Sequence, residues 1–86
     1  MKVENFKHIN QYLITDKDII TFQSYNSTIA EYNRLTGNLK VFEDWDYSNT
    51  TRKHFKMFIN EETIFNYETK KQWIKEMQEN NKIEVV

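Results

Sequence analysis

The 86-residue sequence lacks cysteine and proline and contains a single glycine, Gly37. Without cysteine, the chain can form neither a disulfide nor a thiolate metal site, the two devices that commonly stabilise a small fold. Disordered tails and flexible linkers are usually rich in proline and glycine. Because both are scarce, we expect one compact, ordered domain over residues 1–86.

Long apolar runs and an excess of one charge are also missing. The longest apolar runs, such as Met57-Phe58-Ile59, have three residues, which excludes a membrane-spanning helix and a secretory signal peptide. Twelve Lys and Arg residues stand against thirteen Asp and Glu residues, giving a net charge of −1. Nucleic-acid binders are usually strongly basic, so that role would need a local patch. We expect a soluble, cytoplasmic protein with no membrane partner.

Aromatic residues are abundant instead, because Phe, Tyr and Trp make up 15% of the chain. Each ring can bury a large area, so rings should supply most of the core. A chain of this length buries only about 60–65% of its extended-chain surface, and all the rings are hard to cover. Exposed rings mark a protein interface or self-association, including a homodimer. The alternative is that an N-terminal helix covers them.

Alternating apolar residues predict three strands in the middle of the chain, over Ile19–Tyr25, Thr28–Asn33 and Leu39–Glu43. The turns that join them are Asn26-Ser27 and Leu35–Asn38, and connections this short favour an antiparallel meander. Ile20 and Phe22 should face one side of this sheet. Ile29, Phe42 and Tyr25 should face the other side, which has no assured cover.

Helical spacing predicts helices over residues 3–13, about 49–60 and about 68–80. The first prediction rests on Val3, Phe6, Ile9 and Leu13, and the alternative is that Tyr12-Leu13-Ile14 already forms a strand. Ser48 or Thr50 should cap the second helix. Thr69 and Gln72 fit a capping box for the third, and Trp73, Ile74 and Met77 form its apolar stripe.

Two short segments complete the fold prediction. Thr63–Tyr67 reads as either a short strand or an extended linker that places Ile64 and Phe65 in the core, and Ile83–Val86 could add an edge strand. The predicted fold class is α+β, with a three-stranded antiparallel meander packed against two or three helices.

Ser24–Ala30 and Tyr47–His54 together resemble a group of small uncharacterised domains from phages and prophages of Gram-positive bacteria. Those domains pair an S-Y-x-T-x-V/I-A hairpin with a Y-S-x-T-T-x-K/R-H helix start. The resemblance covers residues 19–59, and Ser27-Thr28 stands where the hairpin pattern usually has one Thr. It brings no catalytic residues. It implies a small phage accessory protein, a class that commonly binds a host protein or protects the phage from host defence, although fold-level likeness does not fix function.

Enzyme and metal chemistry find little support in the sequence. Ser48, His54 and Asp46 contain the residue types of a nucleophilic triad, but no Gly-rich elbow accompanies them. His8 and His54 are the only imidazoles, and they have no metal-binding spacing. We therefore predict no catalytic residues, no metal and no cofactor.

Phosphate binding at the predicted helix start is the stronger chemical hypothesis. Thr50, Thr51, Arg52 and Lys53 would present hydroxyls and charge beside unpaired backbone N–H groups, and Trp45 and Tyr47 could stack on a base. Glu43, Asp44 and Asp46 immediately upstream would repel a polyanion. Self-capping of the helix explains the same residues without any ligand.

The sequence thus favours a non-enzymatic phage protein that binds a host protein, either to redirect the host or to inhibit its defence. The alternative is a nucleic-acid-binding protein that uses Ser48–Lys53. The predicted partner-binding residues are Trp45, Tyr47, Thr50, Thr51, Arg52, Lys53, Tyr25 and Phe42.

Overall fold

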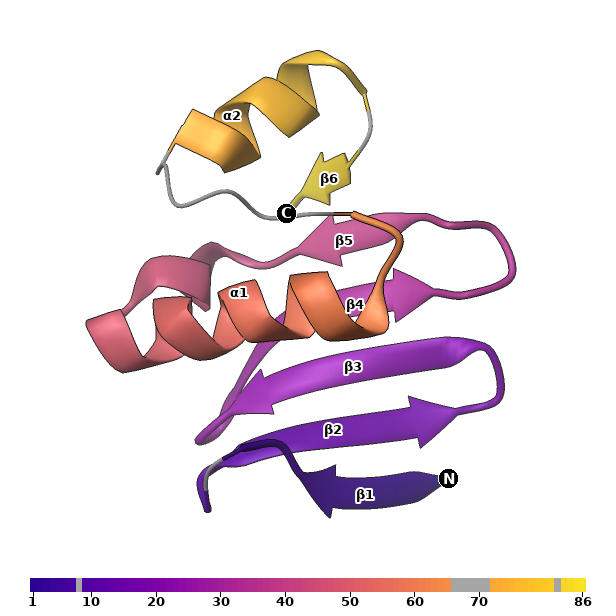
Figure 1. Cartoon of the computed structure of the whole chain (residues 1–86), viewed down its shortest axis with the longest axis vertical. Coiled ribbons are helices and arrows are strands. Elements are labelled where there is room, and N and C mark those ends of the chain that lie inside the picture. The colour runs from indigo at the N-terminus through magenta and orange to yellow at the C-terminus, as the bar shows by residue number, and fades with distance from the viewer. Residues whose placement is uncertain (8, 66–71, 82) are drawn as a thin grey trace.

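The fold is a single sheet with helices packed on one face, as the computed structural model shows (Figure 1). It describes residues 1–7, 9–65, 72–81 and 83–86. The strands are β1 (Lys2–Asn5), β2 (Gln11–Asp16), β3 (Ile19–Ser24), β4 (Ser27–Asn33), β5 (Leu39–Val41) and β6 (Ile83–Val85). The helices are the 3-10 turn η1 (Glu43–Asp46), α1 (Asn49–Glu62) and α2 (Gln72–Glu79).

Within the described residues, the sheet has six strands in sequence order, β1 to β6. Neighbouring strands from β1 to β5 are antiparallel, whereas β6 runs parallel to β5, with Leu39 opposite Ile83. The predicted three-stranded meander packed against two or three helices is therefore wrong, because that meander is only the centre of a six-stranded mixed sheet. In the described residues this sheet is accompanied by one helix of 14 residues and a short second helix, an arrangement consistent with the α+β class at the coarse level. The predicted edge strand at the C-terminal end is confirmed as β6. Its parallel direction follows from the crossover through α1 and α2.

The predicted helix over residues 3–13 is wrong, because this segment forms β1 and the start of β2. Phe6 and Leu13 are buried as its spacing required, but Ile9 is 72% exposed. Lys7 has a φ of 66°, in the left-handed region that no α-helix tolerates. The alternative strand at Tyr12-Leu13-Ile14 is confirmed. The segment extends the sheet instead of covering its second face.

An irregularity between β3 and β4 changes which residues reach the core. Ala30 lies opposite Phe22, but Thr28 lies opposite Gln23, so Ile29 is an extra residue in β4. Such a bulge turns its residue out of the regular alternation. Ile29 is consequently buried, and its predicted place on the open face is wrong. The prediction that Ile20 and Phe22 share the core face is confirmed.

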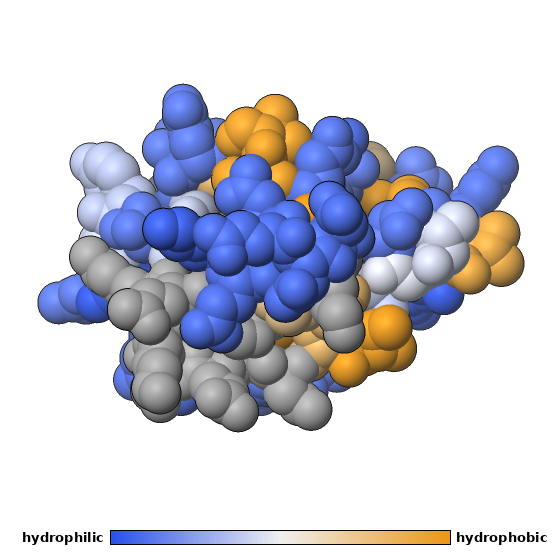
Figure 2. Space-filling view, turned by 90° about the horizontal axis from the view of Figure 1, so that it is seen from above, coloured by the Kyte–Doolittle hydropathy of each residue, from blue (hydrophilic) through white to orange (hydrophobic). Residues whose placement is uncertain are grey.

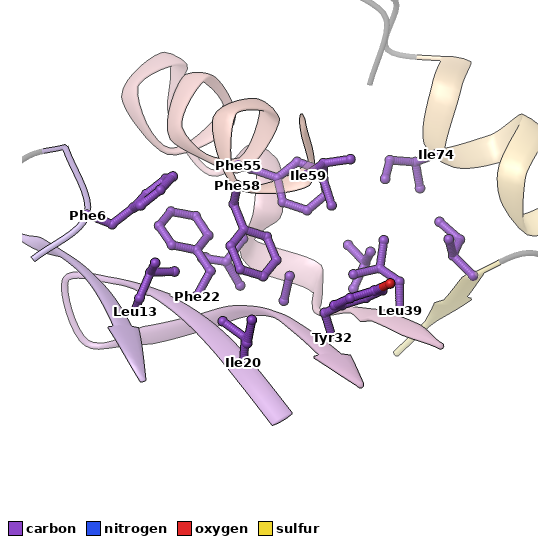
Figure 3. Packing of buried hydrophobic residues seen from close by; sticks show 14 residues of the cluster. Phe6, Leu13, Ile20, Phe22, Tyr32, Leu39, Phe55, Phe58, Ile59 and Ile74 are labelled. Carbon is purple, nitrogen blue, oxygen red and sulfur yellow. The ribbon is translucent and has the colours of Figure 1, made fainter. Parts of the chain in front are cut away.

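The core lies between the sheet and α1, where aromatic rings from distant segments meet (Figure 3). Phe22 of β3 stacks on Phe58 of α1, with ring centroids 5.5 Å apart and planes at 18°. Phe6 makes T-shaped contacts with both rings, with centroid distances of 5.8 and 6.4 Å. Three segments are therefore joined by one aromatic cluster, as the aromatic content predicted.

The C-terminal segments extend this core over β5 and β6. The predicted last helix is confirmed over Gln72–Glu79, where Ile74 is buried; its predicted start at 68, the Thr69 cap and the Trp73 side chain lie outside the described residues. In the preceding linker Phe65 packs against the core, but Ile64 is 75% exposed, so half of that prediction is wrong. Residues 66 and 67 of that prediction lie outside the description as well.

The surface over the α2 end of the molecule is mainly hydrophilic, with hydrophobic residues in separate patches (Figure 2). No helix within the described part of the chain is long and apolar enough to cross a membrane.

Candidate functional site

The first turn of α1 is capped by the side chain of the residue that precedes the helix, Ser48. Ser48 has extended backbone angles, φ −146° and ψ 167°, and its Oγ accepts a hydrogen bond from the Thr51 N–H at 3.1 Å. Between the two predicted caps, Ser48 is therefore the one that caps the helix. Thr50, two residues further along the chain, is exposed.

We expect Ser48→Ala to lower the free energy of unfolding by about 0.5–2 kcal/mol, because an orphan N–H at the helix start loses its acceptor. The matched change Thr50→Ala should cost no more than about 0.5 kcal/mol, as exposed positions usually do. Urea unfolding followed by circular dichroism measures both. Equal losses in the two variants would contradict this assignment of the cap.

Buried hydroxyl groups tie the start of α1 to the β3–β4 hairpin. Ser48 Oγ donates to Thr51 Oγ1 at 3.1 Å, and Thr51 Oγ1 lies 3.2 Å from Ser24 Oγ at the end of β3. Ser24 and Thr51 are both buried. Because buried polar groups are costly unless paired, this chain of hydroxyls fixes the hairpin against the helix.

His54 lies one turn into α1 and is buried. Its Nδ1 is 2.8 Å from the Thr50 carbonyl oxygen, whereas the Ser48 hydroxyl is directed to Thr51. The two residues of the hypothetical triad therefore serve separate structural contacts. Among the described residues, no group of three His, Asp or Glu side chains is arranged to hold a metal ion.

A groove of about 660 Å³ lies between the hairpin tip and the start of α1. We call it the hairpin–helix groove, and its lining residues are Ser24, Tyr25, Asn26, Ser27, Ile29, Asp44, Tyr47, Ser48, Thr50 and Thr51. The buried Ser24, Ile29 and Thr51 supply its floor. The structure thus brings Tyr25, Tyr47, Thr50 and Thr51, four of the predicted residues, to one concave surface.

Two tyrosine rings stand exposed at the rim of the groove. Tyr47 follows η1 and is 82% exposed, and Tyr25 in the hairpin loop is 52% exposed. Tyr25 also has a φ of 54°. A bulky residue rarely adopts this left-handed conformation, which costs about 1–2 kcal/mol relative to the right-handed region. The fold therefore places an aromatic residue at a position whose backbone conformation favours Asn or Gly.

The charge beside the groove is negative. Asp44 lines it, and η1 also carries Glu43 and Asp46. None of the described lining residues is Lys or Arg. Arg52 lies outside the lining and donates to Asn49 Oδ1 at 2.6 Å, and Lys53 is exposed on α1. The predicted cations are thus near the groove without forming its wall.

The remaining predicted residues lie elsewhere. Trp45 is half-buried and packs against Phe55, with ring centroids 5.5 Å apart. Phe42 is half-buried in a separate depression beside Thr28 and Val86. The sequence reasoning missed Ser24 and Ile29 as groove residues. The helical spacing of Thr51 does not indicate that its hydroxyl pairs with the hydroxyl of Ser24 at the end of β3.

Two ionisable features lie near the opposite end of α1. Burial raises the pKa of the Glu62 carboxyl above its ordinary value, and repulsion from Glu61 and Glu4 adds to the shift. Lys7 forms an ion pair with Glu61 at 2.9 Å. Because α1 is 14 residues long, these groups are separated from the groove by the length of the helix.

A model of a protein family described as a family of unknown function, DUF8033, matches residues 1–78. The matched span contains the hairpin, η1 and α1, and therefore the whole hairpin–helix groove. Neither the comparison with curated proteins nor the comparison with solved structures finds a match.

Proposed function

We propose that this chain, which belongs to the DUF8033 family of unknown function, is a non-enzymatic module that binds a partner protein in its hairpin–helix groove. The observation that carries the proposal is the pair of exposed rings, Tyr25 and Tyr47, on the rim of one concave surface. Tyrosine is enriched where protein interfaces gain most of their binding energy.

The rigidity of the groove supports the same proposal. The hydroxyl chain from Ser48 through Thr51 to Ser24 fixes the hairpin against α1 before any partner arrives. A surface fixed in advance loses less conformational entropy on binding. The strained backbone of Tyr25 fits this role, because unfavourable conformations persist chiefly where function uses them.

The chemistry of the groove favours a basic segment of the partner. Asp44 provides a carboxylate in the wall, and both tyrosine faces can attract a cation. A Lys or Arg side chain inserted between the rings would therefore gain charge pairing and ring contact together. The same carboxylate repels phosphate, and Thr51 already uses its hydroxyl internally. These observations favour a protein partner over the nucleic-acid alternative.

The resemblance of residues 19–59 to phage and prophage domains suggests the source of that partner. We propose that the chain is a phage protein working in the host cytoplasm, where it binds a host enzyme or a defence factor. This step rests on the hairpin and helix-start patterns, Ser24–Ala30 and Tyr47–His54, and on the small size of the domain.

The test compares groove variants with a distant control. The wild-type chain, Tyr47→Ser and Leu35→Ser are used to capture proteins from nuclease-treated lysate of a Gram-positive host. Leu35 is 78% exposed in the β4–β5 loop, so its loss matches that of Tyr47 in exposure. We expect one captured protein to bind Tyr47→Ser at least about 30-fold more weakly and Leu35→Ser unchanged. Equal capture by both variants, or no capture by the wild-type chain from this nuclease-treated lysate, would overturn the proposal.

Tyr25→Asn separates binding from folding in the same assay. Asn tolerates the left-handed conformation better than Tyr, so this variant should be as stable as the wild type or slightly more stable. It should nevertheless bind the captured protein more weakly, because the ring is gone. A purely structural role for Tyr25 predicts the opposite, lower stability with unchanged binding.

A further inference from the structure

The first strand leaves one edge of the sheet open. β1 lies at one end of the strand order, and all four of its residues are exposed. Within the described part of the chain, its only strand partner is β2. Open edges are commonly protected by short length, proline, a bulge or charged side chains, and charge of one sign also repels the same charge on a second copy. β1 has no proline, pairs regularly with β2 and alternates its charges, because Lys2 and Glu4 flank Val3.

The pairing with β2 shows which backbone groups of β1 point outward. The Phe6 N–H donates to the Gln11 carbonyl oxygen at 2.7 Å. In an antiparallel ladder, hydrogen-bonded pairs alternate with pairs that are not bonded. Glu4 and Lys2 therefore direct their backbone groups to β2, since Glu4 lies opposite Leu13 and Lys2 opposite Thr15. Val3 and Asn5 direct their N–H and C=O groups away from the sheet.

We propose that β1 pairs antiparallel with β1 of a second copy of this chain, with Val3 opposite Val3 at a two-fold axis. In this register Lys2 of each copy lies opposite Glu4 of the other. The two Val3 residues exchange both of their backbone hydrogen bonds across the axis, and the outward groups of Asn5 meet those of Met1. A single continuous sheet of twice the width results.

The side chains select this register over its neighbours. Outward backbone groups must meet outward groups, so an allowed shift changes the pairing by two residues. One shift places Glu4 opposite Glu4, and the other places Lys2 opposite Lys2. Like charges directly opposite each other destabilise a strand pair, whereas opposite charges stabilise it. Only the proposed register pairs opposite charges at both positions, and symmetry doubles that gain.

The faces of the two sheets also match. Val3 lies on the open face beside Ile14, its neighbour in β2, and is 56% exposed. In the dimer, the two Val3 side chains would meet between the two Ile14 side chains, giving an apolar row across the interface. Lys2 and Glu4 would form an alternating row of four charges on the helix-bearing face. Within one chain these two residues already approach to 3.8 Å, Nζ to Oε2.

Sedimentation velocity at protein concentrations rising to about 1 mM tests the proposal. We expect reversible dimerisation by the wild-type chain, and dimerisation weakened by about tenfold or more in Val3→Pro. Proline removes both central hydrogen bonds of the interface, but no bond within the chain, because the Val3 N–H points away from β2. Circular dichroism should show the variant folded. A wild-type chain that stays monomeric, or a dimer that Val3→Pro leaves intact, would overturn the proposal.

A charge exchange tests the register independently of proline. Lys2→Glu should weaken the dimer by about tenfold, because it places carboxylates opposite each other twice. The double variant Lys2→Glu with Glu4→Lys should return the affinity to within about threefold of the wild type. If the double variant remains as weak as the single one, the strands do not pair with Val3 opposite Val3.

Discussion

Phe58→Ala is expected to destabilise the domain more than any exposed substitution. Phe58 is fully buried, stacks on Phe22 and makes a T-shaped contact with Phe6. Truncating a buried Phe to Ala costs about 3–5 kcal/mol, including the cavity it leaves. A domain of 86 residues has a total stability of only about 4–13 kcal/mol. One ring therefore represents a large share of the folding free energy.

Guanidinium unfolding followed by circular dichroism measures this loss. Ile64→Ala is the matched control, because Ile64 is also a large apolar residue beside α1 but is exposed. It should change the free energy of unfolding by less than about 0.5 kcal/mol. A loss below about 1 kcal/mol for Phe58→Ala would mean that the Phe6, Phe22 and Phe58 cluster does not form as described.

The second large effect is a gain in stability from Gln11→Met. The Gln11 side chain is fully buried at the start of β2, opposite Ser24. Among the residues that the structure describes, neither its Nε2 nor its Oε1 has a hydrogen-bond partner. An unpaired buried amide costs about 1–3 kcal/mol, and Met fills nearly the same volume without polar atoms that need partners. We expect the free energy of unfolding to rise by that amount.

Thermal and urea unfolding of Gln11→Met, with Gln78→Met as control, measure this gain. Gln78 is exposed on α2, so the same chemical change there should stay within about 0.5 kcal/mol of the wild type. A loss of stability in Gln11→Met would show that the amide is paired in solution, for example through a buried water molecule.

The sequence predicted the centre of the fold because local patterns decide it. Strands β3 to β5 alternate apolar residues between short turns, and Ser48 precedes a helical stripe of Thr51, Phe55 and Phe58. Each of these patterns is complete within a few residues. The buried positions of α1 therefore followed directly from its spacing.

The parts that the sequence did not predict depend on contacts between distant segments. Val3, Phe6 and Leu13 mimic helical spacing, but Leu13 is buried by the alternation of β2 and Phe6 by packing on Phe22 and Phe58. The bulge at Ile29 depends on the register with β3. The parallel direction of β6 depends on the crossover after α1. Short apolar patterns carry no information on such choices.

The candidate site was predicted in part for the same reason. The surplus of rings predicts that some of them are exposed, and Tyr25 and Tyr47 are. Their meeting at one groove depends on the Ser24–Thr51 contact between residues 27 positions apart, which no local pattern shows. Trp45 is predicted to be available to a partner, but in the structure it is half-buried because it packs against Phe55 of α1.

Site-specific photo-cross-linking in the host cell tests the central claim most directly, because it shows what lies against the groove. A photoreactive benzophenone side chain is placed at position 47 in one chain and at position 35 in the control. We predict a defined protein adduct from position 47, reduced when the same chain also carries Tyr25→Asn, and no such adduct from position 35. No protein adduct from position 47, or the same adduct from both positions, would contradict a binding surface at the hairpin–helix groove.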